Sequence, residues 1–285
     1  MKRVLVTGAA GRIGRAVVTA LLERRTAVTA LVLPGTGGLL SSEDVRVVEG
    51  NACDADRVRD AMVGVDGVVH LSARPAPHSG TPYEVFGDNT LATFTVLEEA
   101  GRAGVRNAVV ASSFAANGLP FASSPLSPAY VPVDVELPSH AEDPYALSKQ
   151  ADELTAAMMA RRHGMTVVAL RYPFVGGCSE RLLSRARQVA DDPAVGAADL
   201  WSYLETGDAA RAALLGLDVR RSGAHVVLVA AARTLAPYPT MDLLRRYHPT
   251  TRIRAELPGR SSPLDLSAAQ DLLGFKADFE LDQNG

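Results

Sequence analysis

Three evenly spaced glycines follow a short apolar run at the start of the chain, in the sequence RVLVTGAAGRIG. Val4–Thr7 predicts a buried β-strand, and Ile13–Arg25 predicts the helix that follows it. In such a strand–turn–helix unit, Gly8 permits a tight turn, Gly11 lets the backbone approach a diphosphate and Gly14 lets the helix pack closely on the strand. The helix N-terminus adds free N–H groups and a positive partial charge. This turn therefore predicts a dinucleotide-binding unit at the N-terminus.

Short apolar runs alternate with helical stretches along the first two-thirds of the chain. The runs are continuous, as strands buried on both faces of a sheet require. Strands joined by helices favour right-handed crossovers. The sequence therefore predicts an α/β fold with a doubly wound parallel sheet of the Rossmann type. We expect strands at 4–7, 27–33, 45–49, 67–71, 107–111 and 166–170, and helices at 13–25, 54–63, 83–103 and 144–163.

The regular alternation ends near residue 171. We predict a Rossmann domain that binds NAD(P) over residues 1–171 and is completed by a late strand near 224–231. Residues 172–285 carry short helical patterns separated by turn-forming prolines, which indicate a small, partly interleaved C-terminal region that binds substrate. A chain of 285 residues fits one large domain with such an addition.

The composition is that of a soluble globular protein, with 47% hydrophobic and 21% charged residues. The net charge of −3 gives no basic field for nucleic acid. No segment has the roughly eighteen apolar residues of a membrane helix, and the N-terminus lacks the apolar stretch of a secretory signal. The two cysteines, Cys53 and Cys178, and the six histidines show no metal-ligand spacing. We expect a cytoplasmic protein that binds no nucleic acid, membrane or metal.

A tyrosine and a lysine lie four residues apart at the start of the helix predicted at 144–163, in PYALSK. Residues i and i+4 share a helix face, so Tyr145 and Lys149 point into the same space. A nearby cation favours the phenolate, which an acid/base for alcohol–carbonyl interconversion needs. The alternative is an exposed helix pair without a catalytic role. Lys149 is one of only three lysines among 29 basic residues, and a compact ammonium suits a phenol and ribose hydroxyls better than a guanidinium does.

Two serines, Ser112 and Ser113, follow the strand predicted at 107–111. The carboxyl ends of strands in an open parallel sheet border the ligand crevice. A hydroxyl there can donate to a substrate carbonyl oxygen and hold it near the tyrosine. Serines at strand ends also form turns without any ligand, so both interpretations stay open.

Together these motifs resemble the short-chain dehydrogenase/reductase superfamily, in its extended branch of sugar epimerases, dehydratases and dehydrogenases. The resemblance rests on TGAAGRIG at 7–14, HLSA at 70–73, the serine pair and YALSK at 145–149. It extends over nearly the whole chain through DNTLATFTVLEEA at 88–100, LRYPFVGG at 170–177, WSYLETGDAARA at 201–212 and SPLDLSAAQDLLGF at 262–275.

The resemblance implies a role for each matching residue. Tyr145 would be the acid/base, Lys149 would bind the nicotinamide ribose and tune Tyr145, and Ser113 would polarise the substrate oxygen. Asn89 would support the strand and the proton path. The implied cofactor-binding residues are Gly8, Ala10, Gly11, Arg12, Ile13, Gly14, Leu33, Asn51, Leu71, Ser72, Ala73, Ser112, Tyr145, Lys149, Tyr172 and Pro173.

Cofactor choice is normally set at the end of the second strand, where a carboxylate selects NAD and an arginine pairs with the 2′-phosphate of NADP. Val32 and Leu33 stand there instead. Asn51 stands where the extended branch usually has an aspartate beside the adenine. Arg12, between the second and third glycines, is the nearest candidate cation, and a solvated arginine is its alternative. The sequence predicts NAD(P) as cofactor and leans to NADP, because no carboxylate repels the extra phosphate.

The loop over 114–144 joins the serine to the tyrosine and must cross the crevice. Its apolar side chains Leu119, Phe121, Leu126 and Tyr130 offer contacts to a substrate. On the far side, three arginines are either anion ligands or ordinary surface residues: Arg171, Arg181 and Arg185.

We expect an NAD(P)-dependent oxidoreductase that transfers a hydride between the nicotinamide and a carbonyl or hydroxyl of a small molecule, such as a sugar, a sugar acid or a secondary-metabolite ketone. A sugar epimerase or dehydratase with internally recycled NAD is one alternative, and a non-catalytic dinucleotide sensor is another. The complete set of Tyr145, Lys149 and Ser113 favours an enzyme over a sensor. The chain is shorter than most sugar-nucleotide epimerases, which favours a small substrate. The resemblance also implies a homodimer through the helices at 83–103 and 144–163.

Overall fold

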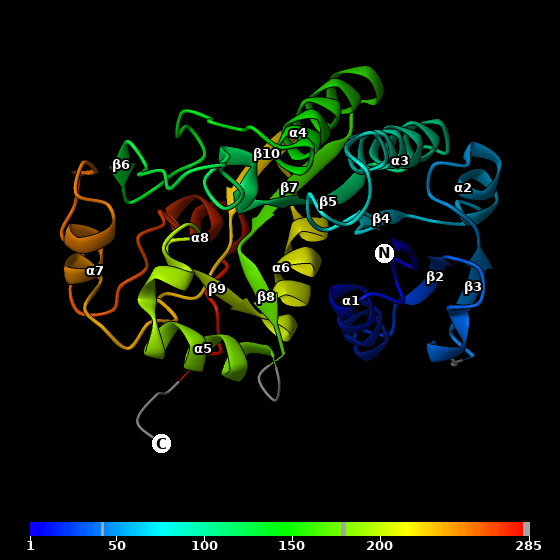
Figure 1. Ribbon diagram of the computed structural model, residues 1–285. Helices are drawn as coiled ribbons and strands as arrows, with labels where there is room; N and C mark the ends of the chain where they lie inside the picture. The colour runs from blue at the N-terminus through cyan, green and yellow to red at the C-terminus, as the bar shows by residue number, and fades with distance from the viewer. Residues whose placement is uncertain (41–42, 178–180, 282–285) are drawn as a thin grey trace.

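A seven-stranded, wholly parallel sheet forms the centre of the computed structural model, which describes residues 1–40, 43–177 and 181–281 (Figure 1). Its strand order is β10-β7-β5-β4-β1-β2-β3. The predicted α/β doubly wound fold is therefore confirmed. The strands are β1 (Arg3–Thr7), β2 (Ala27–Val32), β3 (Val45–Glu49), β4 (Gly67–His70), β5 (Asn107–Ser113), β7 (Thr166–Tyr172) and β10 (Gly223–Leu228).

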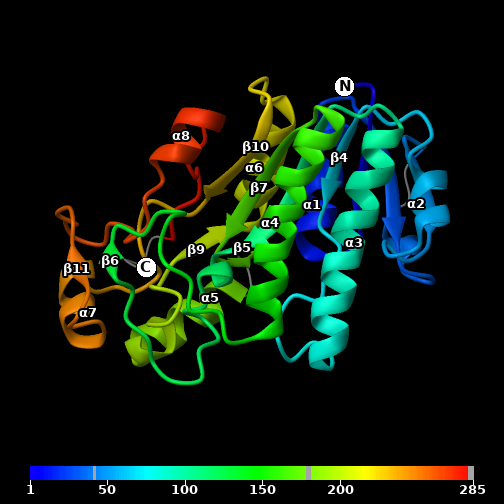
Figure 2. The same ribbon diagram turned by 90° about the horizontal axis from the view of Figure 1, so that it is seen from above.

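Helices cover both faces of this sheet (Figure 2). Alternate side chains of β1 enter different cores: Val4 and Val6 lie in one hydrophobic cluster with α1 and α6, and Leu5 lies in the other with α2, α3 and α4. Both sides of each strand are thus buried, which explains the continuous apolar runs. The helices over the sheet are α1 (Arg12–Glu23), α2 (Ala55–Ala61), α3 (Pro82–Arg102), α4 (Pro144–His163), α6 (Thr206–Asp218) and α8 (Ser267–Leu273).

Most of these helices begin at a side chain that caps their first turn. Asp54 accepts hydrogen bonds from the first turn of α2, Asp143 does so for α4, and Thr81 forms a capping box with Glu84 at the start of α3. Among the described residues, no side chain caps α1, whose N-cap residue is Gly11. Its first N–H groups are therefore left for another partner.

The C-terminal region is built from two separate parts of the chain. Phe114, Leu119 and Tyr130, from the loop between β5 and α4, pack in one hydrophobic cluster with Trp201 and Leu243. The loop predicted to cross the crevice is therefore anchored in the core of the C-terminal region. The remaining elements are η1 (Gly37–Leu39), η2 (Phe114–Asn117), β6 (Tyr130–Val131), β8 (Phe174–Gly176), α5 (Arg181–Asp191), η3 (Pro193–Gly196), β9 (Tyr203–Glu205), α7 (Thr240–Tyr247) and β11 (Arg252–Ile253).

Two short parallel pairings join the pieces of this region. β6 pairs with β11, and β8 pairs with β9. The late strand predicted near 224–231 is β10, which pairs with β7 at the edge of the central sheet. The C-terminal half thus both completes the sheet and builds on it. No helix in the described part of the chain is long and apolar enough to cross a membrane.

Close packing of α1 on β1 gives a first prediction. A Cβ at Gly14 would lie 2.2 Å from the carbonyl oxygen of Gly8 and 2.8 Å from Cα of Ala9, both backbone atoms. We expect Gly14→Ala to lower the free energy of unfolding by about 1–3 kcal/mol or more, because the helix must move outward. Urea denaturation measures the change.

The matched control is Gly87→Ala on α3, where an added Cβ meets no atom within 4 Å. Alanine exceeds glycine in helix propensity by about 1 kcal/mol, so this variant is expected to be more stable than the parent. Equal stability of Gly14→Ala and the parent would contradict the proposed packing constraint.

Candidate active site

The glycine turn has the geometry of an anion cradle. Gly8 has a left-handed φ of +63°, and a Cβ there would lie 2.9 Å from the backbone of Leu71 and Ser72. The N–H of Gly11 donates to the carbonyl of Gly8 at 2.9 Å. The first turn of α1 carries no acidic residue and no side-chain cap. A dinucleotide's diphosphate fits these free N–H groups and the positive end of the helix.

A cavity of about 440 Å³ opens beside this turn. It lies at the carboxyl ends of β1, β2, β3 and β4, which is where a doubly wound sheet binds ligands. Nine of the residues predicted for the site line it: Gly8, Ala10, Gly11, Leu33, Asn51, Leu71, Ser72, Ala73 and Asn89. The position of the cavity beside the glycine turn fits the nucleotide half of a dinucleotide.

Nine other residues of the cavity wall were not predicted. Several of them are neighbours in sequence of predicted residues at the strand ends, so their position at the end of a strand could have predicted them. Arg74 and Asp88 form an ion pair with 2.7 Å between Nε and Oδ2; Asp88 begins the motif at 88–100, but no motif includes Arg74. The nine are Leu31, Val32, Thr36, Gly50, Ala52, Cys53, Arg74, Asp88 and Ala92.

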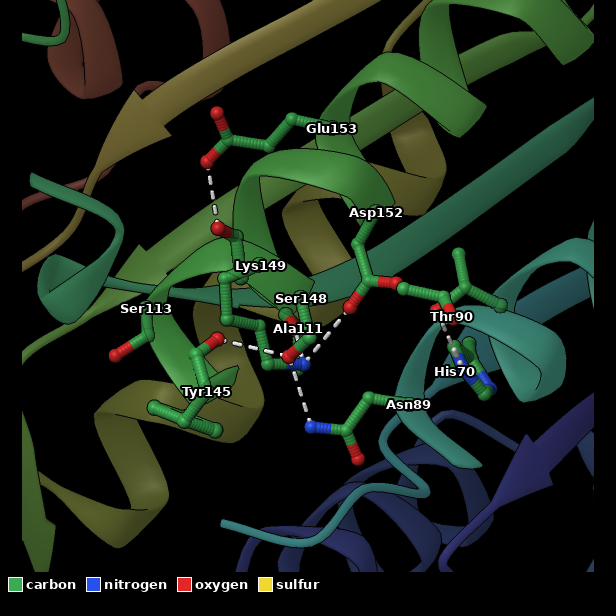
Figure 3. A network of polar contacts seen from close by, with 12 residues as sticks. His70, Asn89, Thr90, Ala111, Ser113, Tyr145, Ser148, Lys149, Asp152 and Glu153 are labelled. Carbon is green, nitrogen blue, oxygen red and sulfur yellow. Dashed lines mark hydrogen bonds and ion pairs between the residues drawn. The ribbon is translucent and has the colours of Figure 1, made fainter. Parts of the chain in front are cut away.

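Asn89 connects the cavity to helix α4. Its Oδ1 accepts a hydrogen bond of 2.7 Å from the N–H of Arg74, in the loop after β4. Its Nδ2 donates to the Ser148 hydroxyl at 2.9 Å, and that hydroxyl donates to the carbonyl of Tyr145 (Figure 3). The sequence predicts that Asn89 supports the strand and the proton path; its hydrogen-bond partners in the structure are Arg74, in the loop after β4, and Ser148 of α4.

Tyr145 and Lys149 lie one turn apart on α4 and are both buried, with 8% and 4% of each residue exposed. The alternative of an exposed helix pair is therefore wrong. The Lys149 Nζ lies 5.7 Å from the centroid of the Tyr145 ring. It donates to the carbonyl of Ala111 at 2.9 Å and to Oδ2 of Asp152 at 3.0 Å (Figure 3). An ammonium has three protons, so one is left for a ligand.

The Lys149 ammonium is held in its charged form. Burial by itself lowers the pKa of a lysine, but the Asp152 carboxylate and the Tyr145 phenol outweigh this effect, and the pKa of Lys149 is raised. A fixed positive charge therefore lies within reach of the phenol.

Ser113 and Tyr145 both contact Ala115. The Ser113 hydroxyl accepts a hydrogen bond of 3.1 Å from the N–H of Ala115, so its own proton stays available for donation. Tyr145 packs in a small cluster with Ala115 and Val85. Phe121, from the crossing loop, contacts the Tyr145 ring edge-on, with 5.9 Å between centroids. The loop thus forms part of the wall around the phenol.

The second serine of the pair has a different role. Ser112 is buried, and its hydroxyl donates to Glu153 at 2.6 Å. Glu153 also forms a two-pronged ion pair with Arg171, at 2.7 and 2.8 Å. Ser112 and Arg171 therefore both bind the Glu153 carboxylate. Neither is among the residues that line the cavity.

The three candidate anion-binding arginines differ in their partners. Arg171 is paired with Glu153, and Arg185 is paired with Asp199 at 3.3 Å. The guanidinium of Arg181 lies 4.5 Å from the centroid of the Phe174 ring. Within the described ranges, Arg181 has no hydrogen bond or ion pair.

Several predicted cofactor residues lie outside the cavity wall. The Tyr172 hydroxyl donates to the carbonyl of Ala209 at 3.0 Å, and burial raises its pKa, so it joins β7 to α6. Gly14 supports the turn by its packing. The predicted residues that do not line the cavity are Arg12, Ile13, Gly14, Ser112, Ser113, Tyr145, Lys149, Tyr172 and Pro173.

The described residues contain no group of three or more His, Cys, Asp or Glu side chains arranged to hold a metal ion. Cys178 lies outside the described residues. Cys53 is half-buried in the cavity wall, where burial and the nearby Asp88 carboxylate raise the pKa of its thiol.

Comparison with known proteins matches residues 4–230 to the NAD dependent epimerase/dehydratase family. A UDP-glucose 4-epimerase from Corynebacterium glutamicum is 27% identical over 248 residues, which cover 78% of this chain and 73% of that protein. An L-arabinose 1-dehydrogenase (NAD(P)(+)) from Haloferax volcanii is 32% identical over 180 residues, or 60% of this chain and 66% of that protein. The solved structure of MoeE5 in complex with UDP-glucose and NAD superposes with a TM-score of 0.71 at 27% identity, covering 98% of this chain and 94% of the other.

Proposed function

The chain belongs to the NAD dependent epimerase/dehydratase family, and from this premise we propose that it is an oxidoreductase for a small hydroxyl- or carbonyl-bearing molecule. The observation that carries the proposal is the buried Tyr145–Lys149 pair, which Asn89 connects to the nucleotide-sized cavity. A sensor would need the cavity but not a buried phenol beside a fixed ammonium.

The chain's own residues divide the work of the proposed reaction. The glycine turn would hold the diphosphate of a dinucleotide, and Leu33 and Asn51 would contact its adenosine half. Bound there, the nicotinamide supplies or accepts the hydride. Tyr145 exchanges a proton with the substrate oxygen, and the free proton of the Ser113 hydroxyl donates to that oxygen. The third proton of Lys149 is left for the ribose.

A sugar or sugar acid is the substrate class that we propose. The matched L-arabinose 1-dehydrogenase is named for a sugar, and it is 32% identical to this chain over 180 aligned residues. Arg181, which has no acidic partner among the described residues, offers a cation for a substrate carboxylate. The crossing loop adds the Phe121 ring beside Tyr145.

An epimerase with internally recycled NAD is the second candidate. The observation that favours it is the match to a UDP-glucose 4-epimerase over 248 residues. Both candidates use the same tyrosine and lysine, so the site geometry does not separate them. They differ in whether the cofactor is consumed.

For the cofactor we propose NAD rather than NADP. The sequence leaned to NADP because no carboxylate follows the second strand. In the sheet register, however, Glu49 of β3 is the partner of Val32 at that point, and its Oε1 accepts from the N–H of Gly35 at 3.0 Å. A carboxylate therefore stands beside this strand end after all, and it would repel a 2′-phosphate. Neither Arg12 nor Glu49 is among the residues that line the cavity, but Glu49 binds Gly35, the residue before Thr36 of the cavity wall.

A homodimer through α3 and α4 remains our proposal for assembly. These helices pack against each other on the outside of the sheet (Figure 2). They expose several large apolar side chains, and an unpaired apolar surface of this kind favours association. The exposed residues are Tyr83, Phe86, Leu91, Phe94, Leu147 and Leu154.

The central test is a panel of sugars, sugar acids and ketones assayed with NAD(H) and NADP(H) separately. We expect a net absorbance change near about 340 nm, the reduced-nicotinamide band, because an oxidoreductase consumes its cofactor. Conversion of substrate without that change would support the epimerase instead. We expect NADH to bind more tightly than NADPH in a fluorescence titration.

A variant checks the proposed cause of that cofactor preference. Glu49→Gln is expected to narrow the affinity difference between NADH and NADPH by roughly fivefold, since an exposed charge pair is worth about 1 kcal/mol. Glu256→Gln, at an exposed carboxylate in the C-terminal region, is the matched control. If Glu49→Gln leaves the ratio of affinities unchanged, Glu49 does not set the preference.

Tyr145→Phe is expected to lower turnover by roughly 10²–10⁴-fold while NAD affinity stays near the parent value, because only the proton donor is lost. The ring contacts to Phe121 and Ala115 remain. Steady-state rates and a separate NAD titration measure the two effects. Tyr83→Phe, at an 89% exposed position on α3, is the control. Near-parental turnover by Tyr145→Phe would refute the proposed acid/base.

Light scattering after size-exclusion chromatography tests the proposed dimer. We expect twice the chain mass of 30.0 kDa for the parent, and the mass of one chain for Leu154→Glu, since a buried carboxylate opposes association. Val195→Glu, at an exposed apolar position in the C-terminal region, should keep the dimer. A monomeric parent would exclude this assembly.

A further inference from the structure

A buried carboxylate lies behind the catalytic lysine. Asp152 follows Lys149 by three residues on α4 and is completely buried, with 0% of the residue exposed. Its Oδ2 lies 3.0 Å from Nζ of Lys149, and its Oδ1 makes no hydrogen bond of good geometry (Figure 3). Burying a charged pair costs desolvation free energy, so we looked to function for the reason that this pair is buried.

A chain of polar side chains reaches Asp152 from the glycine turn. The Thr7 hydroxyl, next to Gly8, accepts hydrogen bonds of 3.2 Å from the N–H groups of Leu71 and Ser72. Both of its lone pairs are then occupied, so it must donate its proton to Nδ1 of His70, 2.7 Å away. A neutral His70 therefore carries its proton on Nε2.

The protonated Nε2 of His70 in turn orients a hydroxyl of α3, that of Thr93. Burial and the Lys149 charge lower the pKa of His70 to about 3, so the ring is neutral at any working pH. Its Nε2–H donates to the Thr93 hydroxyl at 3.2 Å. The proton of Thr93 is then free to face Asp152. Burial raises the pKa of the Asp152 carboxyl, and the Lys149 ammonium and the Thr93 hydroxyl oppose that rise.

We propose that Asp152 is a positioning residue that fixes the Lys149 ammonium in place and keeps it charged, and that Thr7 and His70 orient the Thr93 hydroxyl on the carboxylate's other side. The proposal rests on the proposed function only for what Lys149 then does, which is to serve Tyr145 and the ribose. The charged and polar groups facing Lys149 are Tyr145, Asp152 and Glu153 on α4, neutral His70 on β4 and the Ala111 carbonyl on β5.

Replacement of the carboxylate by the amide of asparagine would keep an acceptor but leave the ammonium with neutral hydrogen-bond partners, this amide and the Ala111 carbonyl. A buried ammonium without a counter-charge has a lowered pKa. In Asp152→Asn, Lys149 would lose its proton in a pH range where the parent keeps it. The positive charge near the Tyr145 phenol would then be lost, together with the third proton of the ammonium.

The unfolding equilibrium of the ligand-free protein tests this directly. In Asp152→Asn, the pKa of Lys149 in the folded state would lie below the unfolded value of about 10.4, so the unfolded chain binds more protons and stability rises with pH up to that value. We expect the folding constant of the variant to rise about tenfold for each unit by which the folded pKa is depressed. In the parent, the pKa of Lys149 is raised, so this group adds no such rise between pH 7 and 10.

The experiment is urea unfolding of parent and variant between pH 7 and 10. Asp242→Asn is the matched control, because it removes the carboxylate of another i,i+3 ion pair, with Arg245, whose side chains are 63% and 71% exposed. We expect the control to follow the parent. A pH dependence of Asp152→Asn that parallels the parent would overturn the proposal.

A second variant keeps the test decisive if Asp152→Asn fails to fold. The double variant Lys149→Met with Asp152→Asn has no buried ammonium, so we expect it to fold and to lack the rise of stability with pH. A double variant that unfolds as readily as the single one would show that Asp152 serves packing alone, and would overturn the proposal.

Activity gives an independent arm. Asp152→Asn is expected to lose kcat/KM as the pH rises through the lowered pKa of Lys149, so a new basic limb appears in its pH profile. A loss that is uniform across pH would overturn the proposal. Because the unfolding experiment needs no turnover, failure of the proposed reaction and failure of the Asp152 proposal are distinguishable.

Discussion

The parallel sheet, buried on both faces, is the constraint on which the rest of the structure depends. Because all seven strands run in one direction, their carboxyl ends share one edge. Thr7 and His70 are register partners on adjacent strands, and Ser113 ends β5 nearby. The polar residues of the site are therefore brought together by strand direction and register, although they are far apart in sequence. The helices then close both faces and leave this edge as the place for a ligand.

Local motifs made a large part of this structure predictable from the sequence. The glycine turn specifies its own geometry, because Gly8 needs a left-handed φ and Gly14 leaves no room for a Cβ. The Tyr145–Lys149 spacing places both side chains on one helix face whatever surrounds them. Both signals lie within a few residues, so sequence inspection could find them without knowing which strands are neighbours.

The features that sequence inspection missed depend on contacts between distant segments. The proposed role of Glu49 in cofactor choice depends on the position of β3 beside β2, and nothing near Val32 in the sequence reveals that carboxylate. Ser112 is a predicted cofactor ligand, but its hydroxyl donates to Glu153, which also binds Arg171. Asp152 was overlooked because a carboxylate three residues after a lysine is usually an exposed helix pair. Only burial distinguishes it.

The crossing loop connects the surroundings of Tyr145 to the C-terminal region. Phe121 contacts the ring of Tyr145, while Leu119 and Tyr130 of the same loop are anchored in the C-terminal cluster beside Trp201. A change in that cluster can therefore move the wall around the phenol without touching the sheet. Tyr145 and Lys149, in contrast, are held by contacts among β5, α3 and α4. The C-terminal cluster and the strand edge are thus held by separate contacts, so the sequence of the first can vary while the second keeps its geometry.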